Sequence, residues 1–193
     1  MSKHNTLEIS IDTDGIKEGL ENTQGNMAKA VRATVSDFKK RAPVWVSKGI
    51  REVYGVDTQS IKEAKGPVEN AGTIRLGGVS IKNCAIKYQG RVLTPVHFKM
   101  TPKVRPKRRY KVKAAIFKGQ KKVLHQAAFL GSNGKSDIPF IRLGKKRLPI
   151  KSIKTLSVPQ MVTSDKAGET ISKLINENME ERLQHNIKRF QDK

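Results

Sequence analysis

The sequence predicts an α+β protein with helices at both ends of the chain and a mostly antiparallel, basic β-sheet between them. Three observations lead to this fold class. Apolar residues recur at helical spacing before residue 66 and after residue 164. From residue 72 to residue 158, apolar residues alternate with polar ones, as in strands. The predicted helices and strands are grouped and do not alternate along the chain. The 193 residues suit a single domain over 1–193, made of segments 1–66, 72–158 and 164–190.

The first segment is predicted to hold one short strand and three helices. Alternating apolar residues over 6–12 indicate a half-buried strand. Apolar residues three and four apart predict a helix over 20–41, and Pro43 suits the first turn of a second helix that Gly55 would cap. Asp57 is the expected N-cap of a third, short helix.

Gly66 and Pro67 should end the third helix, and beyond them the apolar spacing becomes alternating. Two short strands flank Gly77 and Gly78, a pair typical of a β-hairpin turn. Further strands are expected at 92–100, 110–117, 123–124, 127–130 and 138–143, and the apolar pattern continues at Ile150, Ile153 and Leu156. All of these strands are predicted to belong to one central sheet over 72–158.

A long amphipathic helix is predicted over 164–190, beginning at Ser164 or Asp165. Its apolar stripe consists of Ile171, Leu174, Ile175, Met179, Leu183, Ile187 and Phe190. We expect so long a helix to pack along the sheet or against a neighbouring subunit. Leu174→Asp should disrupt this packing by placing a charge on the stripe.

Charge is distributed unevenly along the chain. Lys and Arg number 39 against 17 Asp and Glu, a net charge of +22. Residues 75–154 hold 22 of the basic residues and a single acid, Asp137, so this stretch carries +21 and the rest of the chain +1. A field of this size indicates an anionic partner: nucleic acid, a membrane surface or an acidic protein.

Two basic clusters are the candidate anion-binding segments. Residues 99–109 hold six cations and two prolines, which favour an extended, exposed chain, and residues 144–150 form a second basic turn. The side chains expected to face the anion are Arg105, Lys107, Arg108, Arg109, Lys145, Lys146 and Arg147. Such contact would be salt-sensitive and independent of sequence. The alternative is a solvated charged loop. An aromatic content of 5% argues against stacking of single strands, and no helix-turn-helix or zinc-finger reader is evident.

Residues typical of catalytic or metal sites are scarce. The four histidines, His4, His97, His125 and His185, are far apart and belong to no catalytic or metal-binding motif. Asp137 is the only acid within the basic stretch 75–154, so paired carboxylates would have to lie outside that stretch. We therefore expect no catalytic residues, no cofactor and no metal. His97 is expected to be exposed, His125 to be structural and His185 to lie on a helix surface.

Cys84 is the only cysteine, so a disulfide within the chain is excluded. We expect it to be a buried structural residue of a protein made in a reducing cytoplasm. No apolar run approaches the ~18 residues of a membrane helix, and the first residues lack the apolar stretch of a signal peptide.

The most distinctive block of sequence runs from 138 to 161. It contains IPFIRLGKKRLPIK (138–151) and ends in Ser157, Val158, Pro159, Gln160 and Met161. The long helix with ERLQHNI (181–187) follows. In these residues the chain resembles the minor tail protein Z family of phages and prophages, the tail completion proteins of long-tailed phages. The resemblance covers most of the chain, and we expect Pro159 and Gln160 to fix the turn into the last helix.

The resemblance implies a structural role in the virion, finishing the tail in the neck region so that it joins a DNA-filled head, after assembly in the host cytoplasm. It implies a homo-oligomeric ring, with a hexamer expected, and no membrane partner. The tail terminator, tail tube and tape measure proteins are the expected partners, together with nonspecific contact between the basic surface and genomic double-stranded DNA. The alternative function, which rests on charge alone, is a free, sequence-nonspecific nucleic-acid-binding protein.

Overall fold

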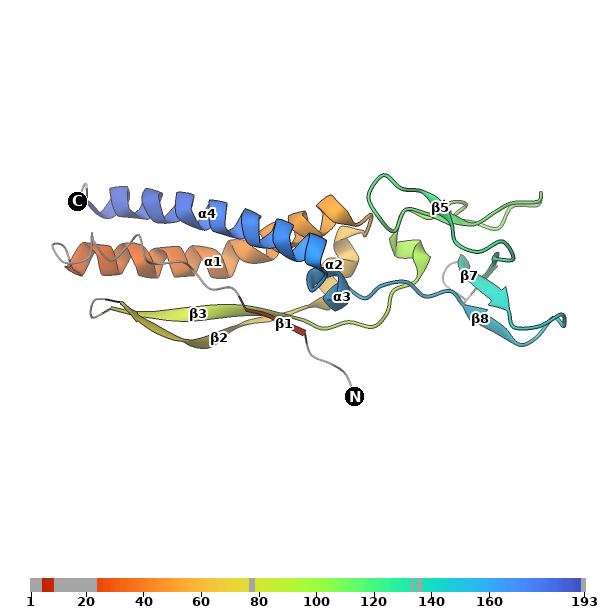
Figure 1. Cartoon of the computed structure of the whole chain (residues 1–193), viewed down its shortest axis with the longest axis horizontal. Coiled ribbons are helices and arrows are strands. Elements are labelled where there is room, and N and C mark those ends of the chain that lie inside the picture. The colour runs from red at the N-terminus through yellow and green to blue at the C-terminus, as the bar shows by residue number, and fades with distance from the viewer. Residues whose placement is uncertain (1–4, 9–23, 77–78, 133, 135–136, 192–193) are drawn as a thin grey trace.

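The computed structural model describes residues 5–8, 24–76, 79–132, 134 and 137–191. The fold is α+β and elongated, as Figure 1 shows. Two long helices, α1 (Gln24–Val53) and α4 (Asp165–Gln191), run antiparallel along one half of the molecule, and a twisted sheet lies beneath α1. Small sheets and loops make up the other end, which we call the β4–β8 end.

The sheet beneath the helices has strand order β1-β3-β2 and is antiparallel throughout. Its members are β1 (Asn5–Glu8), β2 (Lys65–Leu76) and β3 (Val79–Tyr88). The predicted hairpin is confirmed, because Leu76 pairs with Val79, while its turn at Gly77 and Gly78 lies outside the described residues. Of the strand predicted over 6–12, residues 9–12 also lie outside them.

The prediction of one central sheet over 72–158 is wrong. Apart from β2 and β3, the strands of this stretch form two separate antiparallel sheets, β4-β5 and β6-β7-β8. Their bounds are Lys113–Ala114, Lys122–Val123, Phe129–Ser132, Asp137–Arg142 and Ile150–Ser152, in order from β4 to β8. Segment 92–100 contains a 3-10 turn, η2 (Pro95–His97), in place of a strand. Within 110–117 only Lys113 and Ala114 belong to a strand, and Phe117 forms a single antiparallel bridge with Tyr54. The alternation there reflects burial of Val112 and Ala114 in a small core.

The prediction of a helix break at Pro43 is also wrong. Helix α1 continues through Pro43 as a single element of 30 residues. A proline inside a helix costs about 3 kcal/mol, and packing of the neighbouring turns offsets this cost. Ala42, Val46 and Ile50 are fully buried in the main core on either side of the proline. Tertiary packing therefore overrides the local preference.

Gly55 was expected to cap the second helix, but its role is to let the backbone of Ala115 and Ile116 lie close to the end of α1. Its backbone N–H donates to the carbonyl of Ile116 at 2.9 Å, and a Cβ here would meet the carbonyl oxygen of Ala115 at 2.1 Å. The prediction of a helix N-capped by Asp57 is confirmed by α2 (Thr58–Ala64). This helix ends at Ala64, and the Gly66–Pro67 pair already belongs to β2.

The main core lies between α1, α4, β3 and α3 (Val158–Val162). The predicted helix over 164–190 is confirmed by α4. It does not pack along the sheet, which was one of the two contacts expected of it, because α1 lies between α4 and the sheet (Figure 1). Ile171, Ile175 and Met179 of its stripe are buried, and Leu174 is half-buried. The helices approach closely at Gly49, where a Cβ would meet the Ile171 side chain at 2.7 Å.

A buried polar contact fixes how α4 lies on α1. Asn186 is 2% exposed, and its side-chain amide donates to the hydroxyl of Thr34 at 3.1 Å and to the carboxylate of Asp37 at 3.3 Å. Sliding the helices along each other would leave the Asn186 amide buried without these partners, which costs about 1–3 kcal/mol. Asn186 therefore specifies the register of the helix pair.

Replacing Tyr88 by phenylalanine should raise the free energy of unfolding by about 1 kcal/mol. The Tyr88 side chain is 2% exposed, and within the described residues its hydroxyl has no hydrogen-bond partner. The contrasting variant is Tyr110→Phe, which should lose stability because the Tyr110 hydroxyl accepts a hydrogen bond. Urea denaturation measures both, and lower stability for Tyr88→Phe would contradict the assignment.

The same phenol should also make stability fall at alkaline pH. Burial raises the pKa of Tyr88 above its ordinary value of about 10. The unfolded chain therefore loses this proton before the folded protein does, so the contribution of Tyr88 is complete below about pH 10 and declines as pH rises above it. Urea midpoints measured on both sides of pH 10 should fall less for Tyr88→Phe than for the unsubstituted protein.

Candidate anion-binding surface

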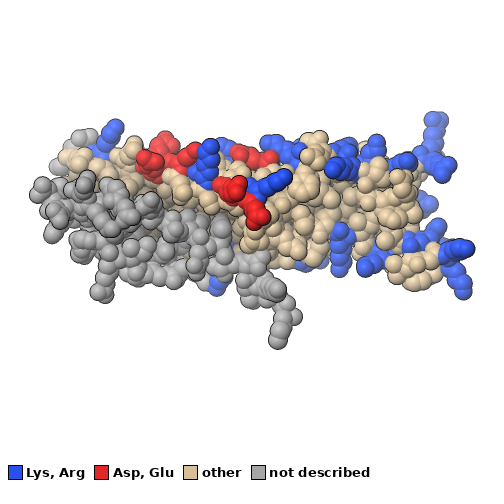
Figure 2. Space-filling view, viewed as in Figure 1, with Lys and Arg blue, Asp and Glu red and all other residues tan. Residues whose placement is uncertain are grey.

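The seven cations predicted to face an anion lie on two exposed loops at the β4–β8 end. Loop 103–109 precedes Tyr110, and loop 143–149 joins β7 to β8. The seven side chains, all on exposed residues, are Arg105, Lys107, Arg108, Arg109, Lys145, Lys146 and Arg147. Figure 2 shows Lys and Arg gathered over this end, while Asp and Glu gather over the helices on the face shown. The structure thus brings the two basic clusters to one end of the molecule (Figure 1).

Contacts on both sides hold loop 103–109 in place. Before it, Thr101 and Lys113 exchange two backbone hydrogen bonds of 2.8 and 2.9 Å. Within it, the backbone N–H of Arg105 donates to the carboxylate of Asp137 at 2.8 Å. After it, the hydroxyl of Tyr110 accepts from the backbone N–H of Leu130 at 2.9 Å. The loop is therefore closed at its base by Thr101 and Lys113 and attached at two further points to β7 and β6, which are 32 and 20 residues away in sequence.

Loop 143–149 is closed by its own backbone. Strand β7 pairs with β8 up to Arg142 and Ile150, and the N–H of Leu143 donates to the carbonyl of Pro149 at 3.1 Å. Every residue of the loop is exposed, including Leu143 at 61% and Leu148 at 66%. The three cations at its tip therefore project from a closed hairpin.

The seven cations have no carboxylate partners within the described part of the chain. The ion pairs found there join His97 to Asp57 and Lys173 to Glu177, both away from the two loops. Asp137 is the only acid between residues 75 and 154, and its contact with loop 103–109 is to the backbone. The positive field at this end is consequently not neutralised by the described residues.

Three aromatic rings at this end, Tyr110, Phe129 and Phe140, are half-buried, and Phe117 is 43% exposed and stacks on Tyr54. Phe129 and Phe140 stack on each other with centroids 6.1 Å apart, and the guanidinium of Arg142 lies 5.1 Å from the Phe129 ring. Tyr110 packs on the second core, which is built around Met100, Val112 and Leu130. Rings held in this way do not form a platform for unstacked bases, so the arrangement suits contact with a phosphate backbone.

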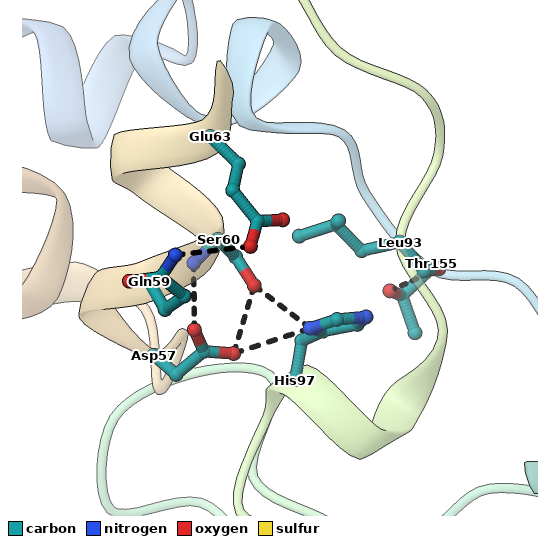
Figure 3. Close-up of polar contacts among 7 residues, drawn as sticks. All are labelled: Asp57, Gln59, Ser60, Glu63, Leu93, His97 and Thr155. Carbon is teal, nitrogen blue, oxygen red and sulfur yellow. Dashed lines mark hydrogen bonds and ion pairs between the residues drawn. The ribbon is translucent and has the colours of Figure 1, made fainter. Parts of the chain in front are cut away.

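A cluster of Asp57, Ser60 and His97, which the sequence did not reveal, lies where α2 meets η2 (Figure 3). The Asp57 carboxylate caps α2 by accepting from the N–H of Ser60 at 2.7 Å, and it also accepts from the Ser60 hydroxyl at 2.8 Å. Nδ1 of His97 lies 2.7 Å from that hydroxyl and 3.2 Å from the carboxylate. His97, which was expected to be exposed, is half-buried, and these contacts leave its side chain 34% exposed.

The geometry of this cluster differs from that of a hydrolytic triad. In a triad, the serine and the acid bind opposite nitrogens of the imidazole, so that the ring accepts the serine proton on one nitrogen while the acid orients it through the other. Here both Ser60 and Asp57 contact the same nitrogen, and Ser60 is 4% exposed. The backbone N–H of Asp57 also donates to the carbonyl of His97 at 3.0 Å. The cluster therefore joins two segments about 40 residues apart in sequence.

Asp57→Ala should lower the free energy of unfolding by about 1–2 kcal/mol, because it removes the cap of α2 and the partner shared by Ser60 and His97. Asp57→Asn retains an acceptor oxygen for the Ser60 N–H and should cost less. Urea denaturation at neutral pH measures both variants. Equal stability for Asp57→Ala and the unsubstituted protein would contradict this role.

The other residues considered for chemistry lie apart from one another. His125 accepts a hydrogen bond from the N–H of Ala127 at 3.1 Å, as expected of a structural role, and His185 is exposed on α4. His4 and the side chain of Cys84 lie outside the described residues. Among the side chains that are described, no three His, Cys, Asp or Glu residues come together as a group that could hold a metal ion.

The block 157–161 forms the start of α3. The Ser157 hydroxyl accepts from the N–H of Gln160, and the Gln160 side chain accepts in return from the N–H of Ser157 at 2.9 Å, which is a capping box. Pro159 lies in the first turn, where its missing N–H has no helical partner to lose. The prediction that Pro159 and Gln160 fix the turn into the last helix is wrong, because both lie in the first turn of the separate helix α3, and the turn into α4 is formed by Thr163 and Ser164. Val158 and Met161 are buried in the main core.

No protein-family model, curated protein or solved structure matches this chain. None of the described helices has both the length and the apolar character that crossing a bilayer requires.

Proposed function

We propose that this chain is a structural protein of a phage tail that acts in tail completion and in joining the tail to the head. One observation carries the proposal: seven cations that have no carboxylate partner among the described residues lie on two loops at one end of an elongated molecule. Such an end suits contact with a large anionic surface, either packaged duplex DNA or the acidic faces of neighbouring tail proteins. The resemblance of block 138–161 to the minor tail protein Z family supports the setting.

In this proposal the protein acts in the tail or neck of the virion as a homo-oligomeric ring, with six copies expected. The tail terminator, tail tube and tape measure proteins are its proposed neighbours. A closed ring would repeat the basic end of each copy around one axis, so that the cations of all subunits face one anionic partner.

The second candidate is a free, sequence-nonspecific nucleic-acid-binding protein. The exposed cations of loops 103–109 and 143–149 favour it, since they need no assembly to reach a phosphate backbone. The mass of the purified protein in solution discriminates the two functions. A discrete ring favours the tail protein, whereas a monomer with strong, salt-dependent affinity for nucleic acid favours the free binder.

Particles assembled without this chain test the proposal directly. We expect tails that lack it to be defective in joining heads or in delivering DNA. Supplying the protein should correct this defect. The matched control supplies a variant whose basic loops are intact but whose helix cations Lys39, Lys40 and Arg41 are glutamine. If tails without the chain join heads and deliver DNA normally, the proposed function is wrong.

A further inference from the structure

Asp137 occupies an unusual electrostatic position. It is the only acid between residues 75 and 154, so it is surrounded in sequence by 22 cations. Its carboxylate accepts the backbone N–H of Arg105 at 2.8 Å, which ties the first residue of β7 to the middle of loop 103–109. This contact joins residues 32 positions apart.

The charge of Asp137 and its hydrogen bond have opposite consequences for anion binding. A carboxylate among phosphate-facing cations repels a polyanion, so its charge alone weakens binding. Its hydrogen bond fixes the backbone at Arg105 and reduces the conformational freedom that the loop would lose on binding. An acid at this position assists binding only if the fixed shape of the loop outweighs the repulsion.

On the basis of the proposed function, we propose that Asp137 is a positioning residue. Its hydrogen bond holds loop 103–109 in place, so that this loop and loop 143–149 both contact the phosphate backbone of one duplex nucleic acid. Tyr110 acts with it at the end of the loop, through the hydrogen bond from the N–H of Leu130. Both loops project from the same end of the molecule, as Figure 1 shows.

Two observations favour a duplex over the other anionic partners. Phe129 and Phe140 stack on each other and Tyr110 packs on the second core, so these three rings do not present the row of free ring faces that single strands use. Four of the cations on the two loops are lysines: Lys103, Lys107, Lys145 and Lys146. Lysine is depleted in protein–protein interfaces, whereas protein–DNA interfaces are strongly positive.

The test compares Asp137→Ala with Asp137→Asn in the full-length protein. Both variants remove the same negative charge, but asparagine keeps an oxygen that can accept the Arg105 N–H and alanine does not. Affinity for a fluorescently labelled DNA duplex is measured by anisotropy at physiological salt. We expect Asp137→Asn to bind at least as tightly as the unsubstituted protein, and Asp137→Ala to bind about tenfold more weakly than Asp137→Asn.

Tyr110→Phe provides a second variant in case Asp137→Ala does not fold. It removes the oxygen that accepts the Leu130 N–H without changing net charge, and we expect it also to weaken duplex binding. Equal or tighter binding by Asp137→Ala than by Asp137→Asn would overturn the positioning role. If Asp137→Ala is unfolded, duplex binding by Tyr110→Phe equal to that of the unsubstituted protein would overturn it.

Poly-L-glutamate serves as the probe for an acidic protein partner. If the Ala and Asn variants differ in binding to poly-L-glutamate and bind the duplex equally, the duplex assignment is overturned. Loss of the positioning role and loss of the duplex assignment can each be distinguished from failure of the proposed function. That function fails only when particles lacking the chain behave normally, whatever the affinities of the Asp137 variants.

Discussion

Ile175→Asp should prevent folding. Ile175 is fully buried in the main core, on the stripe by which α4 packs along α1. An unpaired carboxylate there would lose its hydration, and the effective penalty is several kcal/mol per ion. The lost apolar burial adds about 2 kcal/mol or more. Together these costs are comparable with the total stability of a domain, about 5–15 kcal/mol.

Leu174→Asp is the matched control, since it places the same charge one residue earlier on the same helix. Leu174 is half-buried, so its carboxylate can keep part of its hydration, and we expect a destabilised but folded protein. Circular dichroism and thermal melting distinguish the two variants. A folded Ile175→Asp protein as stable as Leu174→Asp would contradict the packing of α4 on α1.

Neutralising Lys107, Arg108 and Arg109 together as glutamine should weaken binding to duplex DNA by on the order of tenfold to a hundredfold at physiological salt. The slope of log affinity against log salt concentration should become shallower by about three, one for each lost phosphate contact. Thermal stability should change little, because the three side chains are exposed and, within the described residues, form no ion pairs. Fluorescence anisotropy over a series of salt concentrations measures both effects.

The chain offers a control of equal charge. Lys39, Lys40 and Arg41 are three consecutive exposed cations on α1, and changing them to glutamine removes the same net charge from the helical half. We expect this variant to lose much less affinity than the loop variant. Equal losses would mean that net charge, and not its location at the β4–β8 end, controls binding.

Elements with strong local patterns could be predicted from the sequence. The apolar stripe of α4 runs from Ile171 to Phe190, Asp57 precedes a short helical segment, and two glycines separate the alternating strands of the hairpin. In each case residues close in sequence determine the element. The exposed basic loops belong with these, because their prolines and cations indicate surface chain without reference to a partner.

Features that depend on distant residues could not be predicted in this way. Nothing near Pro43 shows that burial of Ala42 and Val46 carries α1 through the proline. Nor does alternation over 110–117 reveal that only Lys113 and Ala114 belong to a strand there. The contact of Asp137 with Arg105 joins residues 32 positions apart, and a pattern of single residues contains no information about such a pairing.

Protection of lysines from chemical acetylation by bound duplex DNA, read residue by residue by mass spectrometry, tests the central claim most directly. If the β4–β8 end is the anion-binding surface, DNA should protect Lys103, Lys107, Lys145 and Lys146 and leave Lys39, Lys40 and Lys173 on the helices reactive. Equal protection of lysines on the helices and on the two loops, or protection of the helices alone, would contradict it.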